Sequence, residues 1–128
     1  MIRIVRLGSP RADDEGLRIG TVRRPPRGVP KSQFASGNWY DVWFPLLAPS
    51  VATLKQGQHA ATRKAWTAFV KRYKSEMRAP DAERALALLA ALSRVTDVSV
   101  GCYCEDESRC HRSVLRELLV SKGAAVAS

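Results

Sequence analysis

The segment VTDVSVGCYC, from Val95 to Cys104, constrains the fold of this chain more than any other. It is apolar and rich in β-branched residues, and Asp97 is its only charged residue. Such a run is typical of a central strand with both faces buried, as in a parallel sheet. Because helical patterns precede and follow it, the chain is predicted to be an α/β protein with a small mixed or parallel sheet flanked by helices.

Four helices are expected from apolar spacing and from helix start and stop signals. Residues 62–77 form an amphipathic pattern with a basic outer face, and residues 80–94 begin with Pro80 in the first turn. The pattern that starts at Cys110 ends at Gly123, and a short helix is expected at 50–55. Further strands are predicted at 1–7, 16–22 and 41–47.

The length of the chain limits it to one domain. With 128 residues, of which 45% are hydrophobic, it can bury one core but not two. We predict a single α/β domain over residues 1–123 and a frayed tail over 124–128.

The charge balance favours an anionic partner. Lys and Arg number 21 against 12 for Asp and Glu, which gives a formal net charge of +9. The most basic irregular segment is RRPPRGVPKS, in which three prolines and a glycine exclude regular structure while Arg23, Arg24, Arg27 and Lys31 concentrate positive charge. A polyanionic or phosphorylated partner is therefore favoured, and a basic composition without function is the alternative.

The apolar runs are too short for a secretory signal or a membrane span, the longest being Ala85 to Leu92. A cytoplasmic protein without membrane association is expected. Thiols are reduced in that compartment, and three cysteines make a poor disulfide framework. No cofactor is predicted.

All three cysteines and one of the two histidines lie in CYCEDESRCHR, residues 102–112. Cys104 lies at the carboxyl end of the predicted strand, and His111 and Arg112 lie at the start of the next helix. Ligands of open α/β sheets bind at such positions, where helix N–H groups are unpaired. We expect an anion there, held by His111 and Arg112 together with Arg23, Arg27 and Lys31.

Three chemistries compete with simple anion binding in this stretch. A phosphatase-like loop needs an arginine six positions after the cysteine, but the positions six after Cys102 and Cys104 are Ser108 and Cys110. A zinc site has the right number of ligands in Cys102, Cys104, Cys110 and His111, but the spacing is atypical, because the first pair would share a strand face and the second pair would diverge on a helix. A thiolate nucleophile is the third, either Cys104 at the strand end or Cys110 at the helix start, and Cys104 with His111 is the candidate catalytic pair. Buried structural cysteines are the alternative without function.

Two stretches carry a resemblance to a known family. CYCEDESRCHRSVL resembles the strand, loop and Cys-His-Arg helix start of domain-of-unknown-function family 488, which includes the YeaO-like proteins. RIGTVRRPPRGVPK resembles the arginine turn of the same pattern at Arg23, Pro26, Arg27, Gly28 and Lys31, whereas Val22 and Pro25 depart from it. WYDVWFPLLAPS and WTAFVKRYKSEM also fit. The resemblance implies a compact α/β domain in which the arginine turn and the Cys-His-Arg helix start face one pocket.

These observations predict a pocket for a phosphate-bearing ligand, either a nucleotide or a nucleic acid, on whose base Trp39 or Tyr40 could stack. The opposing interpretation is that the arginines pair with Glu15, Asp41 or the acidic loop at 105–107. An enzyme that uses Cys104 and His111 and a small zinc-stabilised domain are the two alternative functions.

Overall fold

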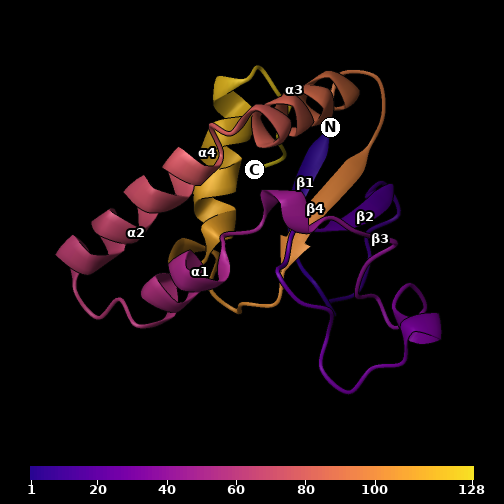
Figure 1. Cartoon of the computed structure of the whole chain (residues 1–128). Helices are drawn as coiled ribbons and strands as arrows, with labels where there is room; N and C mark the ends of the chain where they lie inside the picture. Colours follow the sequence, from indigo (N-terminus) through magenta and orange to yellow (C-terminus); the bar gives the residue numbers. More distant parts are fainter.

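The protein is an α/β domain built on one parallel sheet, in a computed structural model that describes residues 1–128 (Figure 1). The strands β1 (Ile2–Arg6), β2 (Leu17–Gly20), β3 (Val42–Trp43) and β4 (Val98–Cys102) are arranged in the order β1-β4-β2-β3. All neighbours are parallel, with Ile4 opposite Val100 and Ile19 opposite the same residue. The predicted fold class is confirmed, and the sheet is parallel rather than mixed.

Strand β4 is the centre of the sheet, as its composition predicts. All five of its residues are buried, and it pairs with β1 on one side and β2 on the other. It is shorter than the predicted strand 95–104, because its pairing with β1 ends where Arg6 lies opposite Cys102. Cys104 therefore lies beyond the strand, in the loop that follows.

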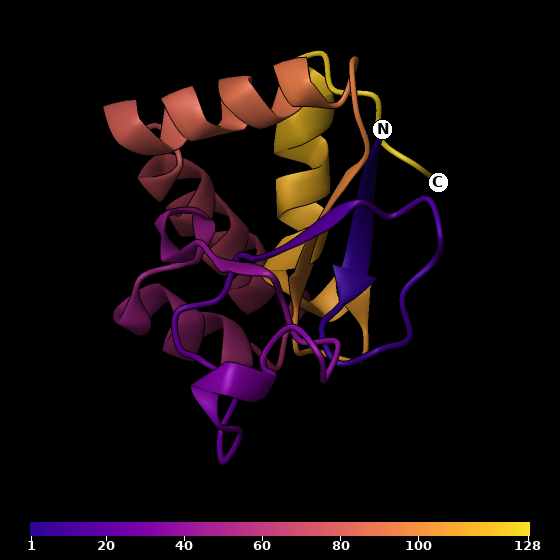
Figure 2. The same ribbon diagram turned by 90° about the vertical axis from the view of Figure 1, so that its right-hand side faces the viewer.

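Three helices lie in the connection between β3 and β4, and a fourth follows β4. They are α1 (Val51–Gln58), α2 (Arg63–Glu76), α3 (Pro80–Leu92) and α4 (His111–Ser121). The helices gather on one side of the sheet, as the turned view shows (Figure 2). Side chains from α2, α3 and α4 pack there against β1, β2 and β4 in the main hydrophobic core, which includes Tyr73, Leu86, Val100 and Leu115.

A buried ion pair lies on the other face of the sheet. Arg18 of β2 is fully buried and its Nε atom donates a hydrogen bond of 2.7 Å to Glu15 Oε1. The Ser99 hydroxyl of β4 donates to the same oxygen. Arg18 also donates to the carbonyl oxygens of Ser9 and Asn38, at 2.8 and 2.7 Å. This network fixes the loop after β1 against the sheet.

Two predicted segments differ in the structure. The strand expected at 41–47 is limited to β3, because Pro45 begins a 3-10 helix, Pro45–Leu47. The tail at 124–128, expected to be frayed, runs beside β1: Ile2 N–H donates to Ala125 O at 2.7 Å and Ala127 N–H donates to Ile2 O at 2.8 Å. None of the helices combines the length and the apolar character needed to cross a membrane.

Candidate functional site

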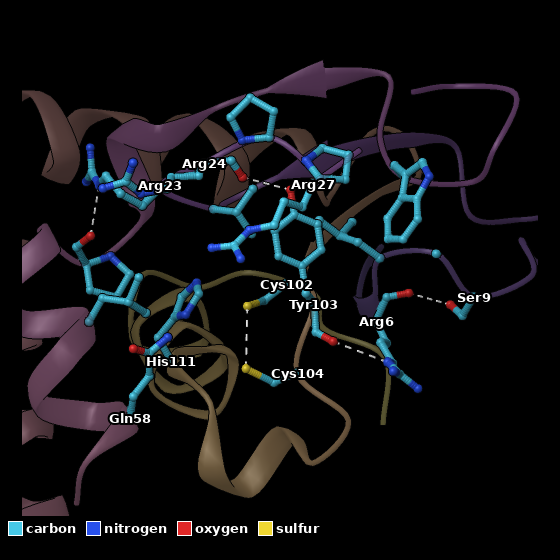
Figure 3. A pocket seen from close by; sticks show the side chains of 18 of the residues that line it. Arg6, Ser9, Arg23, Arg24, Arg27, Gln58, Cys102, Tyr103, Cys104 and His111 are labelled. Atoms are coloured by element: carbon cyan, nitrogen blue, oxygen red, sulfur yellow. Dashed lines mark hydrogen bonds between the residues drawn. The ribbon is translucent and has the colours of Figure 1, made fainter. Parts of the chain in front are cut away.

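A pocket of about 900 Å³ opens at the carboxyl ends of β1, β2 and β4. Its walls come from the segments that leave these strands, together with two side chains of α1 (Figure 3). Ligand sites of parallel sheets occur at this edge because helix starts and loops meet there. The lining residues that carry polar, aromatic or sulfur groups are Arg6, Ser9, Arg23, Arg24, Arg27, Trp39, Gln58, Cys102, Tyr103, Cys104 and His111.

The proline-rich segment places three arginines along the pocket, and they are not equivalent. Arg23 donates hydrogen bonds to the carbonyl oxygens of Pro45, Ala48 and Pro49, at 3.0 to 3.1 Å. Arg24 and Arg27 are exposed, and neither forms an ion pair. Arg23 therefore fastens the segment 45–49, while Arg24 and Arg27 keep guanidinium groups available to a ligand.

The acidic residues that could neutralise this segment are engaged elsewhere. Glu15 pairs with Arg18, and Asp41 pairs with Arg11 at 2.8 Å. In the acidic loop, Glu107 pairs with Arg116 at 2.7 Å. The arginine turn consequently has no carboxylate partner in the protein.

The two candidate aromatic residues are placed differently. Trp39 lines the pocket, whereas Tyr40 is only 3% exposed and belongs to a small core cluster with Leu7 and Val22. Gly8 makes room for the indole: its φ is +92°, and an added Cβ would come within 2.9 Å of the Trp39 ring. Of these two candidates, only Trp39 can therefore stack on a bound base.

The cysteines converge at the floor of the pocket, which Cys102 and Cys104 line and Cys110 does not. Cys102 and Cys110 are buried and Cys104 is exposed. Cys102 Sγ lies 3.8 Å from Cys104 Sγ (Figure 3). Cys110 Sγ lies 3.8 Å from Nδ1 of His111. The divergence expected from the sequence is absent, because Cys104 is outside β4 and Cys110 is the extended N-cap of α4, with φ −131° and ψ 153°, rather than a residue of the helix.

The close contacts among the thiols separate their acidities. Hydrogen bonds from Cys102 and Cys110 lower the pKa of Cys104, against the opposing effect of its partial burial, and the nearby Arg112 charge adds to the decrease. The same contact with Cys104, together with burial, raises the pKa of Cys102. When one thiol of the cluster ionises, the charge therefore resides on Cys104, the exposed thiol of the pocket wall.

His111 is neutral and fixed in orientation. Burial lowers its pKa to about 4, although its hydrogen bond with Thr21 opposes that decrease. The bond joins Nε2 to the Thr21 carbonyl oxygen at 2.7 Å. Because a carbonyl oxygen only accepts hydrogen bonds, Nε2 carries the proton and Nδ1 presents a lone pair toward Cys110.

Two of the predicted ligand-binding residues lie outside the pocket wall. Lys31 is exposed in the short 3-10 helix Lys31–Gln33. Arg112 is buried at 4% exposure, and one of its terminal nitrogens donates to Cys104 O at 2.6 Å. Its Nε atom is buried without a hydrogen-bond partner. Arg112 therefore holds the loop at Cys104 and is not part of the cavity surface.

Sequence reasoning missed several lining residues, most notably Arg6 and Tyr103. Arg6 donates to Tyr103 O at 3.3 Å and forms an exposed ion pair with Glu105 at 3.6 Å, and the Tyr103 hydroxyl donates to Arg24 O at 2.8 Å. Arg6 lies at the carboxyl end of a predicted parallel strand, which is the signal that could have identified it. Gln58 comes from α1 and carried no such signal.

The comparisons with known proteins identify the family of the chain but no activity, substrate or ligand. A family model described as the "Active DUF488-N3 subclade" matches residues 2–123, which is nearly the whole chain. Neither the curated proteins nor the solved structures include a significant match.

Proposed function

The chain belongs to the DUF488 family, and we propose that the arginine-lined pocket at the carboxyl edge of its sheet binds a small phosphate-bearing ligand such as a nucleotide. The observation that carries the proposal is the pair of exposed arginines, Arg24 and Arg27, which line the cavity and have no carboxylate partner. Guanidinium groups bind phosphate through paired, charge-assisted hydrogen bonds.

The local backbone supports this role for the two arginines. The segment that carries them is anchored by Arg23 through three carbonyl oxygens and by the Tyr103 hydroxyl through the carbonyl of Arg24. Pro25 and Pro26 further restrict it. A pre-organised segment loses little conformational entropy on binding, so more of the interaction energy appears as affinity.

The shape of the site favours a small ligand over a polynucleotide. Its volume of about 900 Å³ matches the range of pockets that enclose small molecules. Trp39 lines the pocket and supplies an aromatic ring for a base. Arg6 and Arg23 lie on opposite sides of the pocket (Figure 3). A nucleotide could therefore place its phosphate at the arginine segment and its base near Trp39.

Titration calorimetry with AMP, ADP and inorganic pyrophosphate at low ionic strength tests the proposal. Arg24→Gln and Arg27→Gln should each weaken binding by about tenfold or more, which is the effect of losing one charge-assisted hydrogen bond of about 1.5–3 kcal/mol. Arg84→Gln is the matched control, because Arg84 is a 79% exposed arginine of α3, away from the pocket.

Three results would contradict the proposal. One is the absence of binding of any of these phosphates at millimolar concentration. Another is equal affinity in the Arg27→Gln and Arg84→Gln variants. The third is tight binding of a single-stranded oligonucleotide with a steep salt dependence and no binding of mononucleotides, which would assign the basic surface to a polynucleotide instead.

A further inference from the structure

The cysteine and histidine cluster at the end of β4 has the composition of a metal site. The ligand atoms of Cys102, Cys110 and His111 all lie within 4.8 Å of one another. Cys104 adds a third sulfur, 3.8 Å from that of Cys102. Three sulfurs and one imidazole form a soft ligand set that suits zinc and does not suit magnesium or calcium, which prefer oxygen.

The spacing of these atoms fits tetrahedral coordination. With Zn–S bonds of about 2.3 Å, two sulfur ligands of a tetrahedral site are separated by about 3.8 Å. The Cys102–Cys104 sulfur separation is 3.8 Å, and Cys110 Sγ lies at the same distance from His111 Nδ1. The remaining separations within the buried trio are at most 4.8 Å, so these three ligand atoms reach one ion through small side-chain movements. Cys104 lies outside this trio and completes the set by turning its exposed side chain toward the ion.

The orientation of His111 is an independent indication of a metal. Its Nε2–H group donates to the Thr21 carbonyl oxygen at 2.7 Å, which leaves the Nδ1 lone pair directed into the cluster. Histidines that ligate metals nearly always donate their other ring N–H group to a backbone carbonyl or a carboxylate in this way. The ring is thus held in the tautomer and direction that coordination requires.

The surroundings also suit the charge of the complex. Three thiolates and one Zn²⁺ ion carry a net charge of −1. The buried Arg112 side chain lies against the same loop through its bond to Cys104 O, and its Nε–H group has no partner in the protein. The cluster lies at the N-terminus of α4, where the helix dipole stabilises negative charge.

From this geometry we propose that Cys102, Cys104, Cys110 and His111 Nδ1 bind one Zn²⁺ ion at the floor of the pocket. The ion joins the end of β4 to the start of α4 and thereby fixes the loop that separates them. Binding releases the protons of the three thiols, so affinity falls as the pH is lowered. This inference does not depend on a phosphate ligand, because its evidence is the sulfur and nitrogen cluster alone.

The test is metal stoichiometry in the full chain without an affinity tag, purified under reducing conditions. Elemental analysis and native mass spectrometry should find one zinc per chain, bound with a dissociation constant below about 100 nM in competition with a chromogenic chelator. Substitution with Co²⁺ should give the absorption of a tetrahedral site together with a sulfur-to-cobalt charge-transfer band.

Variants locate the ion. Cys104→Ser alters an exposed side chain and should leave the fold intact, as circular dichroism would show, while it weakens Zn²⁺ binding at least tenfold. His111→Gln should also weaken it. His59→Gln is the matched control for the second histidine, which is exposed in the loop after α1, and should leave binding unchanged.

Any of three outcomes would overturn the proposal. The first is a folded, reduced protein that takes up no zinc. The second is one equivalent of zinc that binds Cys104→Ser and His111→Gln as tightly as the unmodified chain. The third is a cobalt complex without a sulfur charge-transfer band. A protein that binds zinc but binds none of the phosphate compounds would contradict only the function proposed for the pocket.

Discussion

Replacement of Arg18 by Met should destabilise the protein by about 3–5 kcal/mol, because it removes one partner of a buried ion pair and leaves the other charged. Arg18 and Glu15 have side chains that are 0% and 3% exposed, and their closest atoms lie 2.6 Å apart. The substitution also leaves the carbonyl oxygens of Ser9 and Asn38 without their donor. The Glu15 carboxylate and these two carbonyl oxygens then each lose a hydrogen bond that water cannot easily replace.

Urea denaturation followed by circular dichroism measures this effect. With an m value of about 2 kcal/mol/M, the midpoint should fall by about 2 M. Arg3→Met is the matched control, because Arg3 forms its ion pair with Asp14 on the surface and its loss should change the midpoint little. The double variant Glu15→Gln, Arg18→Met should lose less stability than the sum of the two single variants, since it leaves no unpaired buried charge.

The Arg18 prediction also concerns the site. The network of Arg18 holds the loop after β1, and Gly8, Ser9 and Pro10 of that loop line the pocket. A midpoint for Arg18→Met that equals that of Arg3→Met would refute the reasoning. It would mean that the loop is held by its other contacts.

Two further substitutions test other parts of the argument. Partial burial raises the pKa of Glu76, but the hydrogen bonds that it accepts from Ser50 and Thr53 at the start of α1 together outweigh burial and lower the pKa. Because the pKa is lowered on folding, this stabilisation is present above about pH 4.5 and is lost as the pH falls through the folded-state value. Glu76→Gln should therefore lower the free energy of unfolding by about 1 kcal/mol at pH 7 and leave it unchanged in acid. An equal loss of stability at pH 7 and pH 3, measured by thermal unfolding, would contradict this. Arg23→Met should lower stability by about 1–3 kcal/mol, since its guanidinium is the donor to three carbonyl oxygens of the segment 45–49; an unchanged urea midpoint would show that those carbonyls need no donor.

The fold class can be predicted from local patterns because those patterns are strong here. All five residues of β4 are buried, so both faces of the strand are covered, which is typical of a central strand in a parallel sheet. Helices α2 and α3 lie close to their predicted bounds, since apolar spacing and the N1 proline are local signals. The end of β4 differs from its predicted position, because it depends on where β1 stops pairing.

The candidate site can be located from sequence but not assembled from it. The carboxyl ends of parallel strands share one edge, so the order of strands and loops along the chain is enough to place Cys104 and the arginine turn together. Which arginine is free depends on distant carbonyl oxygens, and these occupy Arg23 while Arg24 remains available. Tyr40 is absent from the pocket wall because packing buries it, and Lys31 is absent because it is exposed on the 3-10 helix Lys31–Gln33.

By itself, the sequence determined the fold class, the edge of the sheet that carries the pocket and several of the groups near it, because these follow from hydrophobic period and residue order. Only the tertiary structure decided how those groups meet. Spacing along the chain indicated that Cys110 and His111 diverge, whereas the extended backbone at Cys110 and the hydrogen bond between His111 and Thr21 bring them together. Thr21 is 90 residues away from His111 in the sequence, and no local pattern encodes such a contact.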